Sequence, residues 1–179
     1  MAPSGVDGAY GLLRYAARMK FQTIRFALAL PAGILVMAAF TSLLENLAMR
    51  LFELPQSMLD AKALMQKGDA SWRDAMAAAM LDMPIGALLS IVAAWTVGAA
   101  LGVFAACRVS GANFVPLSVA VAILSVAFVS INLIAIPHPM WMNIAGAVLP
   151  PLAAIAVGRL ALTWMPRARV PERPRLTQP

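Results

Sequence analysis

Three polar residues lie at the ends of apolar segments, where their side chains can transfer protons or bind a metal. Glu45 ends one uncharged segment, Asn132 lies about one turn before the end of another, and His138 follows in a turn. A carboxylate and an imidazole can exchange a proton or coordinate a metal ion. His138 is the only histidine, however, and no ligand spacing such as HExxH is present. The competing interpretation is structural: Glu45 pairs with Arg50 or with His138 at the level of the lipid headgroups.

No signature of a known catalytic centre accompanies these residues. The sequence has no Walker A, GxSxG or CxxC motif, and Cys107 is its single cysteine, which excludes an internal disulfide and a cysteine metal cluster. No charged residue lies near the middle of an apolar segment, where ion-coupled transporters usually need one. We therefore expect no enzyme activity, no metal site, no cofactor and no ion-coupled transport.

The composition is that of an integral membrane protein. Of 179 residues, 61% are hydrophobic and only 12% are charged, with a mean hydropathy of +0.79. A soluble domain carries about 25% charged residues, so this chain has too little polar surface to cover a globule in water. The net charge of +6 comes from Lys and Arg that concentrate near the termini, which fits membrane topology better than nucleic-acid binding. The expected partner is the lipid bilayer.

Uncharged intervals predict an all-α fold with a four-helix transmembrane bundle. Residues 26–44, 83–107 and 109–158 contain no Asp, Glu, Lys or Arg. The last interval is too long to cross a hydrocarbon core of about 30 Å only once, and it must turn at Ile136-Pro137-His138-Pro139, where two prolines interrupt the helix. Within a transmembrane domain at 26–165, the predicted spans are 26–46, 84–107, 113–136 and 139–162, and the first external loop is 47–83.

The distribution of Lys and Arg predicts the orientation. The leader, residues 1–25, and the tail, residues 166–179, are both basic, whereas the loop 47–83 mixes both signs. By the positive-inside rule, both termini are cytoplasmic. The leader alternates basic and apolar residues, so we expect an interfacial helix on the anionic inner surface rather than a cleaved signal peptide. We expect the tail to be disordered.

The first external loop is expected to form two short interfacial helices. An apolar series in 57–66 ends at Gly68, and Ser71 resembles the N-cap of a second helix, with Asp74 three residues later. Trp72 then begins an apolar face. A solvated linker is the alternative.

Small residues recur at every fourth position of the second span. Such a stripe lets two helices approach closely, which is the main source of helix association in lipid. It must face either another helix of this chain or a second copy. Leu101 and Val103 lie off the stripe and are expected to face lipid. The predicted helix-packing residues are Gly86, Ser90, Ala94, Gly98, Gly102 and Ala106.

The fourth span contains Pro150-Pro151 near its middle. Each proline deletes a backbone hydrogen bond, so a kink is expected there. Carbonyl groups freed at this depth must be buried in protein or line a cavity. The kink is therefore either a structural bend or part of a transport path.

Several local motifs resemble those of a group of small four-span bacterial membrane proteins with no assigned activity. The shared features are a glutamate that ends the first span, here Glu45, and an Ile-Pro-His-Pro-x-Trp turn between the last two spans. The resemblance covers about residues 29–162 and implies a bacterial inner membrane, but it brings no function with it. The motifs that carry it are Pro84-Ile85-Gly86-Ala87, Ala94-Trp95, Gly98-x-x-x-Gly102 and Ile136-Pro137-His138-Pro139-Met140-Trp141.

These observations support two main hypotheses for function. The first is a non-enzymatic accessory subunit or homo-oligomer that packs against other membrane proteins or itself through the small-residue stripe. The second is a small transporter or permeation protein that uses the kink at Pro150-Pro151 together with Asn132. Enzyme chemistry at Glu45 and His138 is the third and weakest.

Overall fold

The computed structural model describes residues 5–111 and 114–164, with side chains given for 19–111, 115–161, 163 and 164. The predicted tail, 166–179, and the predicted start of the third span at residue 113 lie outside the described residues. The described part of the chain forms six helices and no strand. The helices are α1 (Gly5–Leu51), α2 (Gln56–Lys67), α3 (Trp72–Asp82), α4 (Ile85–Ser110), α5 (Phe114–Ala135) and α6 (Met140–Trp164).

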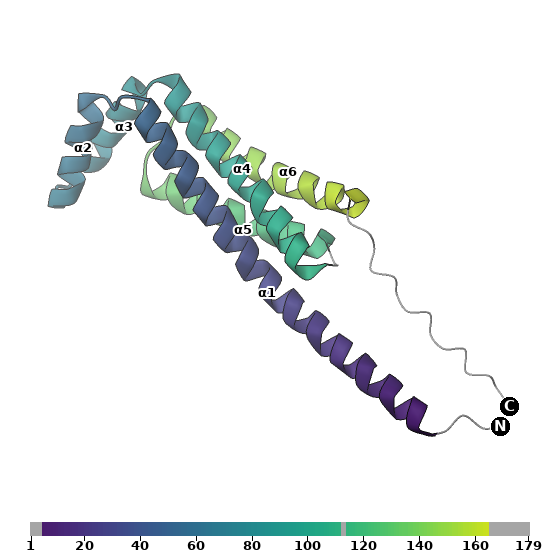
Figure 1. Ribbon diagram of the computed structural model, residues 1–179. Helices are drawn as coiled ribbons and strands as arrows, with labels where there is room; N and C mark the ends of the chain where they lie inside the picture. The colour runs from purple at the N-terminus through teal and green to yellow at the C-terminus, as the bar shows by residue number, and fades with distance from the viewer. Residues whose placement is uncertain (1–4, 112–113, 165–179) are drawn as a thin grey trace.

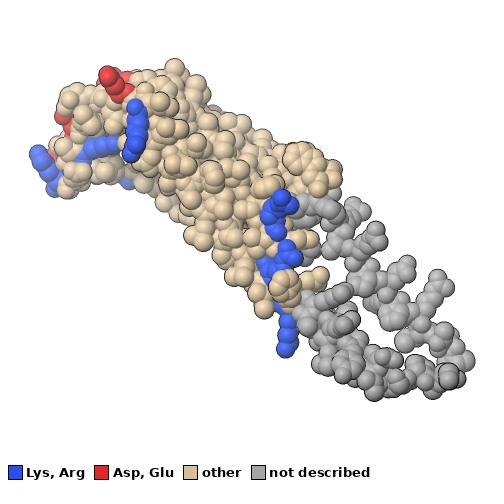
Figure 2. Space-filling model, in the orientation of Figure 1, with Lys and Arg blue, Asp and Glu red and all other residues tan. Residues whose placement is uncertain are grey.

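Four of these helices are long and apolar enough to cross a membrane. The candidate spans are Met19–Leu51 within α1, Ile85–Ser110, Val115–Ala135 and Met140–Ala161. The predicted all-α membrane bundle, with two short helices in its first loop, is therefore confirmed. Figure 2 shows a broad uncharged belt between charged groups at the two ends of the bundle.

α1 continues far beyond the bundle. The leader and the first span form one helix of 47 residues, which is about 70 Å long at the usual rise per residue. Its N-terminal part extends alone past the other helices (Figure 1). Pro31 lies inside α1 without ending it.

The two helices of the first loop, α2 and α3, pack against each other at the end of the bundle away from the termini (Figure 1). Gly68 ends α2 in the left-handed conformation at φ 70°, and the Asp69 N–H donates to the Leu64 carbonyl at 3.1 Å. The Arg73 guanidinium donates to the Ile134 carbonyl of α5 at 3.2 Å, so it ties α3 to the bundle. The buried face of the pair consists of Met58, Ala61, Met76, Ala79 and Met80.

Ser71 does not cap α3 in the predicted way, because its side chain makes no capping hydrogen bond. Its backbone N–H and its hydroxyl both donate to Asp69 Oδ1, at 2.9 and 2.7 Å. These two donors favour the carboxylate and lower the pKa of Asp69. The Ser71 hydroxyl thus closes a turn with Asp69 instead of forming the expected capping box with the first turn of α3.

The small-residue stripe of α4 faces α1. A Cβ added to Gly102 would lie 2.8 Å from the Gly33 carbonyl oxygen and 2.9 Å from Met37 Cβ. A Cβ added to Gly98 would lie 3.0 Å from the Met37 carbonyl oxygen and would clash with the Thr41 hydroxyl. The Thr41 hydroxyl also donates to the carbonyl of Ala94, another stripe residue. The partner of the stripe is therefore a helix of the same chain.

The ends of the stripe also have contacts within the chain. Ala106 is fully buried, and its Cβ lies 3.0 Å from the position of a Cβ on Gly33. At the other end, Gly86 faces the ring of Phe52, just beyond α1. The Ser90 hydroxyl donates to the Gly86 carbonyl within α4 at 2.7 Å.

α4 is the central helix, because it packs against α1, α5 and α6. Packing on three sides explains why Val103, which was predicted to face lipid, is fully buried. The prolines Pro150 and Pro151 do not end α6, and Pro150 is fully buried.

Replacing Gly102 with Leu should lower the yield of folded protein and its thermal midpoint in detergent. The added side chain would overlap the backbone of α1, and overpacking costs about 1–3 kcal/mol even in cores that adjust. Gly33→Leu should act in the same way, because it fills the same contact from the other helix. Val97→Leu is the matched control, since Val97 is 43% exposed on α4. Equal midpoints for all three variants would contradict the close contact.

Candidate functional site

A cavity of about 240 Å³ lies between α1, α4 and α5, in the half of the bundle nearer α2 and α3. It combines one carboxylate, hydroxyl groups and a carboxamide with an apolar wall. Its lining residues are Met37, Ala38, Thr41, Ser42 and Glu45 from α1, Trp95 from α4, and Ser125, Phe128, Val129 and Asn132 from α5.

Helical periodicity brings these side chains to one place. Each of the five lining residues of α1 has another three or four positions away, as does each of the four from α5, so each set lies on one face of its helix. Ser125 and Asn132 are two turns apart on α5. The cavity is therefore a property of facing helix surfaces rather than of one local motif.

Glu45 is held by the indole of Trp95. The Trp95 Nε1–H donates to Glu45 Oε1 at 2.7 Å. Trp95 is only 6% exposed. The edge of its ring packs against Gly146 of α6, where an added Cβ would lie 2.7 Å from the Trp95 Cζ3 atom. A larger residue than glycine at 146 would displace the ring. The position of the carboxylate thus depends on packing between α4 and α6.

His138 packs against this indole. Its ring meets the Trp95 ring edge to face, with centroids 6.1 Å apart and an interplanar angle of 67°. The His138 Nδ1–H donates to the Ile136 carbonyl at 2.6 Å. Burial lowers the pKa of His138, although this hydrogen bond opposes the shift, so the imidazole is neutral at pH 7. No hydrogen bond joins Glu45 to His138 among the described side chains.

Asn132, which lines the cavity, carries an unsatisfied acceptor. Its Oδ1 is buried and has no hydrogen-bond partner. A buried polar atom without a partner costs about 1–3 kcal/mol, so a ligand or water that donates to it would be stabilised there. Asn143 Oδ1, early in α6, is also buried without a partner. It does not line the cavity.

The structure thus relates the three predicted site residues in two different ways. Glu45 and Asn132 line one cavity, whereas His138 does not line it and packs against the Trp95 ring. The partner of Glu45 is neither Arg50 nor His138 but Trp95. No group of three or more His, Cys, Asp or Glu side chains that could hold a metal occurs in the part of the chain that the structure describes.

The sequence analysis did not predict the hydrogen bond from Trp95 to Glu45. Two signals were available. An indole N–H inside a membrane needs an acceptor, and Glu45 is the only acidic residue within a predicted span. The hydroxyls of Thr41, Ser42 and Ser125 gave no such signal, because in a helix they can satisfy themselves on the preceding turn.

Replacing Trp95 with Phe should lower the thermal midpoint in detergent. The substitution removes the donor to Glu45 and leaves one oxygen of this partly buried carboxylate without its partner, at a cost of about 1 kcal/mol. Adding Glu45→Leu to this variant removes the second partner and should raise the midpoint again. Glu53→Leu, at an exposed acidic residue outside the cavity, is the control and should give no recovery. Failure of Glu45→Leu to restore stability would contradict the pairing.

Comparisons of this chain with protein families, with curated proteins and with solved structures find no match. The resemblance at the Ile-Pro-His-Pro-x-Trp turn therefore stays a prediction. What the structure itself shows is a four-span helical membrane protein with a small, partly polar cavity between three of its spans.

Proposed function

We propose that this protein is a non-enzymatic, multi-pass membrane protein that binds a small cationic or hydrogen-bond-donating ligand in the Glu45 cavity. The observation that carries the proposal is that a partly buried carboxylate, that of Glu45, and a residue with an unsatisfied carboxamide oxygen, Asn132, line one cavity. Buried polar groups in lipid are costly, and they are often functional.

The chemistry of the lining favours a ligand with donors and positive charge. Glu45 offers a second carboxylate oxygen beyond the one bonded to Trp95, and Asn132 offers Oδ1. No Lys, Arg or His lines the cavity. The ring of Phe128 adds an aromatic surface, and aromatic faces attract cations. At about 240 Å³, the cavity lies below the range of about 300–1,000 Å³ that is usual for drug-sized ligands, which favours a small ligand.

A binding role fits the site better than catalysis. General acid–base or nucleophilic chemistry needs at least two cooperating groups within hydrogen-bonding reach. Glu45 is the only ionisable group that lines the cavity. His138, the other candidate, does not line the cavity and packs against the Trp95 ring.

The two earlier hypotheses gain unequal support. The small-residue stripe, which motivated the accessory-subunit hypothesis, is used by α1, so it offers no surface to another protein. The permeation hypothesis joined Asn132 to Pro150, but Pro150 is buried and does not line the cavity. We therefore favour a binding site reached from one side over a continuous path. An accessory subunit that uses another surface is the second candidate.

The proposed location is a bacterial inner membrane with both termini cytoplasmic. Among the described side chains, Lys20, Arg25, Arg108 and Arg159 belong to one end of the bundle, and every Asp and Glu lies in residues 45–82 toward the other end. The positive-inside rule places the basic end in the cytoplasm. The resemblance at the Ile-Pro-His-Pro-x-Trp turn supports a bacterial source.

Reporter fusions will test this orientation. A fusion after Gly68, between α2 and α3, should report an external position, and a fusion after Gly111, beyond α4, should report a cytoplasmic one. The reason is the excess of Lys and Arg at the Gly111 end. An alkaline phosphatase and a fluorescent protein give opposite readouts and control for expression. A cytoplasmic signal after Gly68 would reverse the proposed orientation.

Cysteine labelling will test the negative potential in the cavity. In a Cys107→Ser background, Ser42→Cys places a thiol on the cavity lining three residues before Glu45. For each thiol, the labelling rate with a cationic methanethiosulfonate is divided by the rate with an anionic one. This ratio should be higher for Ser42→Cys than for Ala70→Cys in the exposed α2–α3 loop. An electrostatic difference of only about 1 kcal/mol changes a rate about fivefold.

Adding Glu45→Gln should abolish the excess preference for the cationic reagent. Glu53→Gln, which changes an exposed carboxylate outside the cavity, should leave it intact. The proposal is wrong if Ser42→Cys and Ala70→Cys give the same ratio of rates, or if Glu45→Gln has no effect on that ratio.

A further inference from the structure

A second hollow lies between α4 and α6, at the end of the bundle away from α2 and α3. Its volume is about 470 Å³. The walls are apolar and combine small with large side chains: Ala100, Leu101, Phe104, Val157, Leu160 and Ala161. It shares no residue with the Glu45 cavity. We call it the α4–α6 groove.

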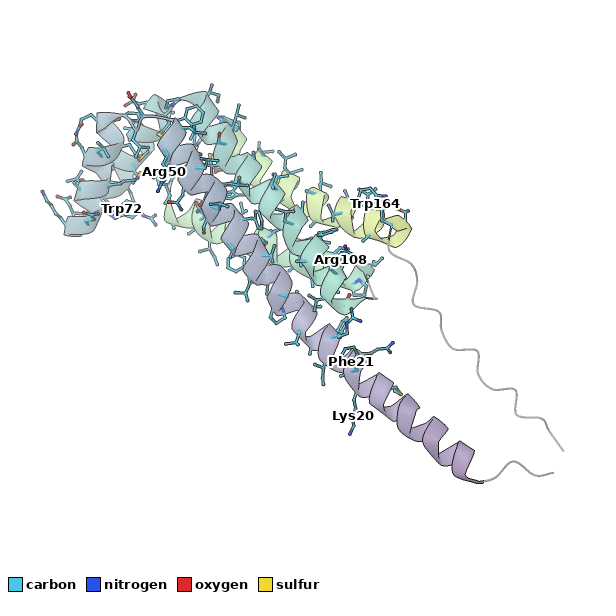
Figure 3. All side chains as sticks on the ribbon, viewed as in Figure 1. Lys20, Phe21, Arg50, Trp72, Arg108 and Trp164 are labelled. Atoms are coloured by element: carbon cyan, nitrogen blue, oxygen red, sulfur yellow. The ribbon has the colours of Figure 1, made fainter. Side chains whose placement is uncertain are left out.

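Two residues with polar side chains stand at one end of this groove. Arg108 comes from the last turn of α4 and Trp164 from the end of α6. Figure 3 shows them at the same end of the bundle. Arg108 is exposed, and its Cζ lies 5.5 Å from the centroid of the Phe104 ring. A tryptophan and an arginine at a span end are typical of the membrane–water interface. The groove therefore runs from the interface into the hydrocarbon.

Among the side chains that the structure describes, Arg108 has no acidic partner, because every Asp and Glu of this set lies in residues 45–82. The Arg25 side chain, by contrast, forms hydrogen bonds with the backbone of α4. Its Nε–H donates to the Val109 carbonyl at 2.8 Å and a terminal N–H to the Arg108 carbonyl at 3.4 Å, so its charge satisfies the C-terminus of α4. The Arg108 side chain remains the basic group directly on the groove.

The position and chemistry of the groove fit a phospholipid. From Arg108 to Ala100 the groove follows about two turns of α4, or about 12 Å. Its wall is apolar along this length, and Arg108 lies at the end nearer the membrane–water interface. An acyl chain would run from a phosphate at Arg108 toward the bilayer centre. A soluble phosphate would use the arginine but none of the apolar wall.

We propose that the α4–α6 groove binds one anionic phospholipid, with its phosphate at Arg108 and an acyl chain along Phe104 and Leu160. Arg binds phosphate through paired N–H donors, which gives this headgroup both charge and geometry. The Trp164 ring covers the mouth at the level of the headgroup. The site is independent of the proposed ligand cavity, so either can fail without the other.

Native mass spectrometry of the full-length protein in a mild detergent tests the proposal. Phosphatidylglycerol and phosphatidylcholine with identical acyl chains serve as probes. Phosphatidylglycerol should bind at least about tenfold more tightly, because both lipids offer a phosphate to Arg108 but only phosphatidylcholine adds a positively charged choline that the guanidinium repels. Arg108→Gln should remove this preference. Arg159→Gln is the matched control, because Arg159 is an exposed arginine on α6 that does not line the groove, and it should keep the preference.

Two further measurements separate the parts of the site. Glycerol phosphate, the headgroup without acyl chains, should not displace the lipid at equal concentration. Ala100→Leu, which fills the groove, should weaken both lipids, whereas Ala93→Leu on an exposed face of α4 should not. Equal binding of the two lipids, equal losses in Arg108→Gln and Arg159→Gln, or displacement by glycerol phosphate would overturn the proposal. Circular dichroism confirms that each variant is folded.

Discussion

The close contact between α1 and α4 at Gly33 and Gly102 is the constraint on which the rest of the bundle depends. In a bilayer, apolar side chains gain nothing by leaving lipid for protein, so helices associate through close packing and hydrogen bonds. Two glycines facing each other let backbone approach backbone, with only 2.8 Å between a carbonyl oxygen and an added Cβ. Rows with a four-residue period on both helices extend this contact in both directions. The row on α1 comprises Arg25, Ala29, Gly33, Met37, Thr41 and Glu45.

This single row connects the two ends of the span. Arg25 reaches the carbonyl groups at the C-terminus of α4, and Glu45 reaches Trp95. The two are 20 residues apart, or about 30 Å along the helix, which is the thickness of the hydrocarbon core. Their charges thus bracket the core and help to fix the depth and rotation of α1. A rotation that moved Gly33 away from α4 would break both polar contacts as well.

The sequence predicted the elements well and their contacts less well. Uncharged intervals and prolines located four spans, because charge in hydrocarbon is costly wherever the neighbours lie. The stripe on α4 was visible, but its partner was not, since spacing shows which face needs protein and not which helix supplies it. Val103 was misplaced for the same reason: packing on three sides of α4 leaves little of it to lipid. The cavity is lined by faces of three helices. No pattern within one helix therefore predicted that Ser125 lines it, or that Trp95 and Glu45 form a pair.

The length of α1 has a mechanical consequence. The same rigid rod that carries Glu45 near one surface continues past the bundle to Gly5, which is 28 residues, or about 42 Å, beyond Gly33. A tilt of about 10° around the Gly33 contact would sweep that far end sideways by about 7 Å. Small rearrangements around Glu45 would then be amplified into a displacement large enough for another molecule to detect. Because α1 is one continuous helix, a tilt at the contact between Gly33 and Gly102 would be transmitted along its whole length.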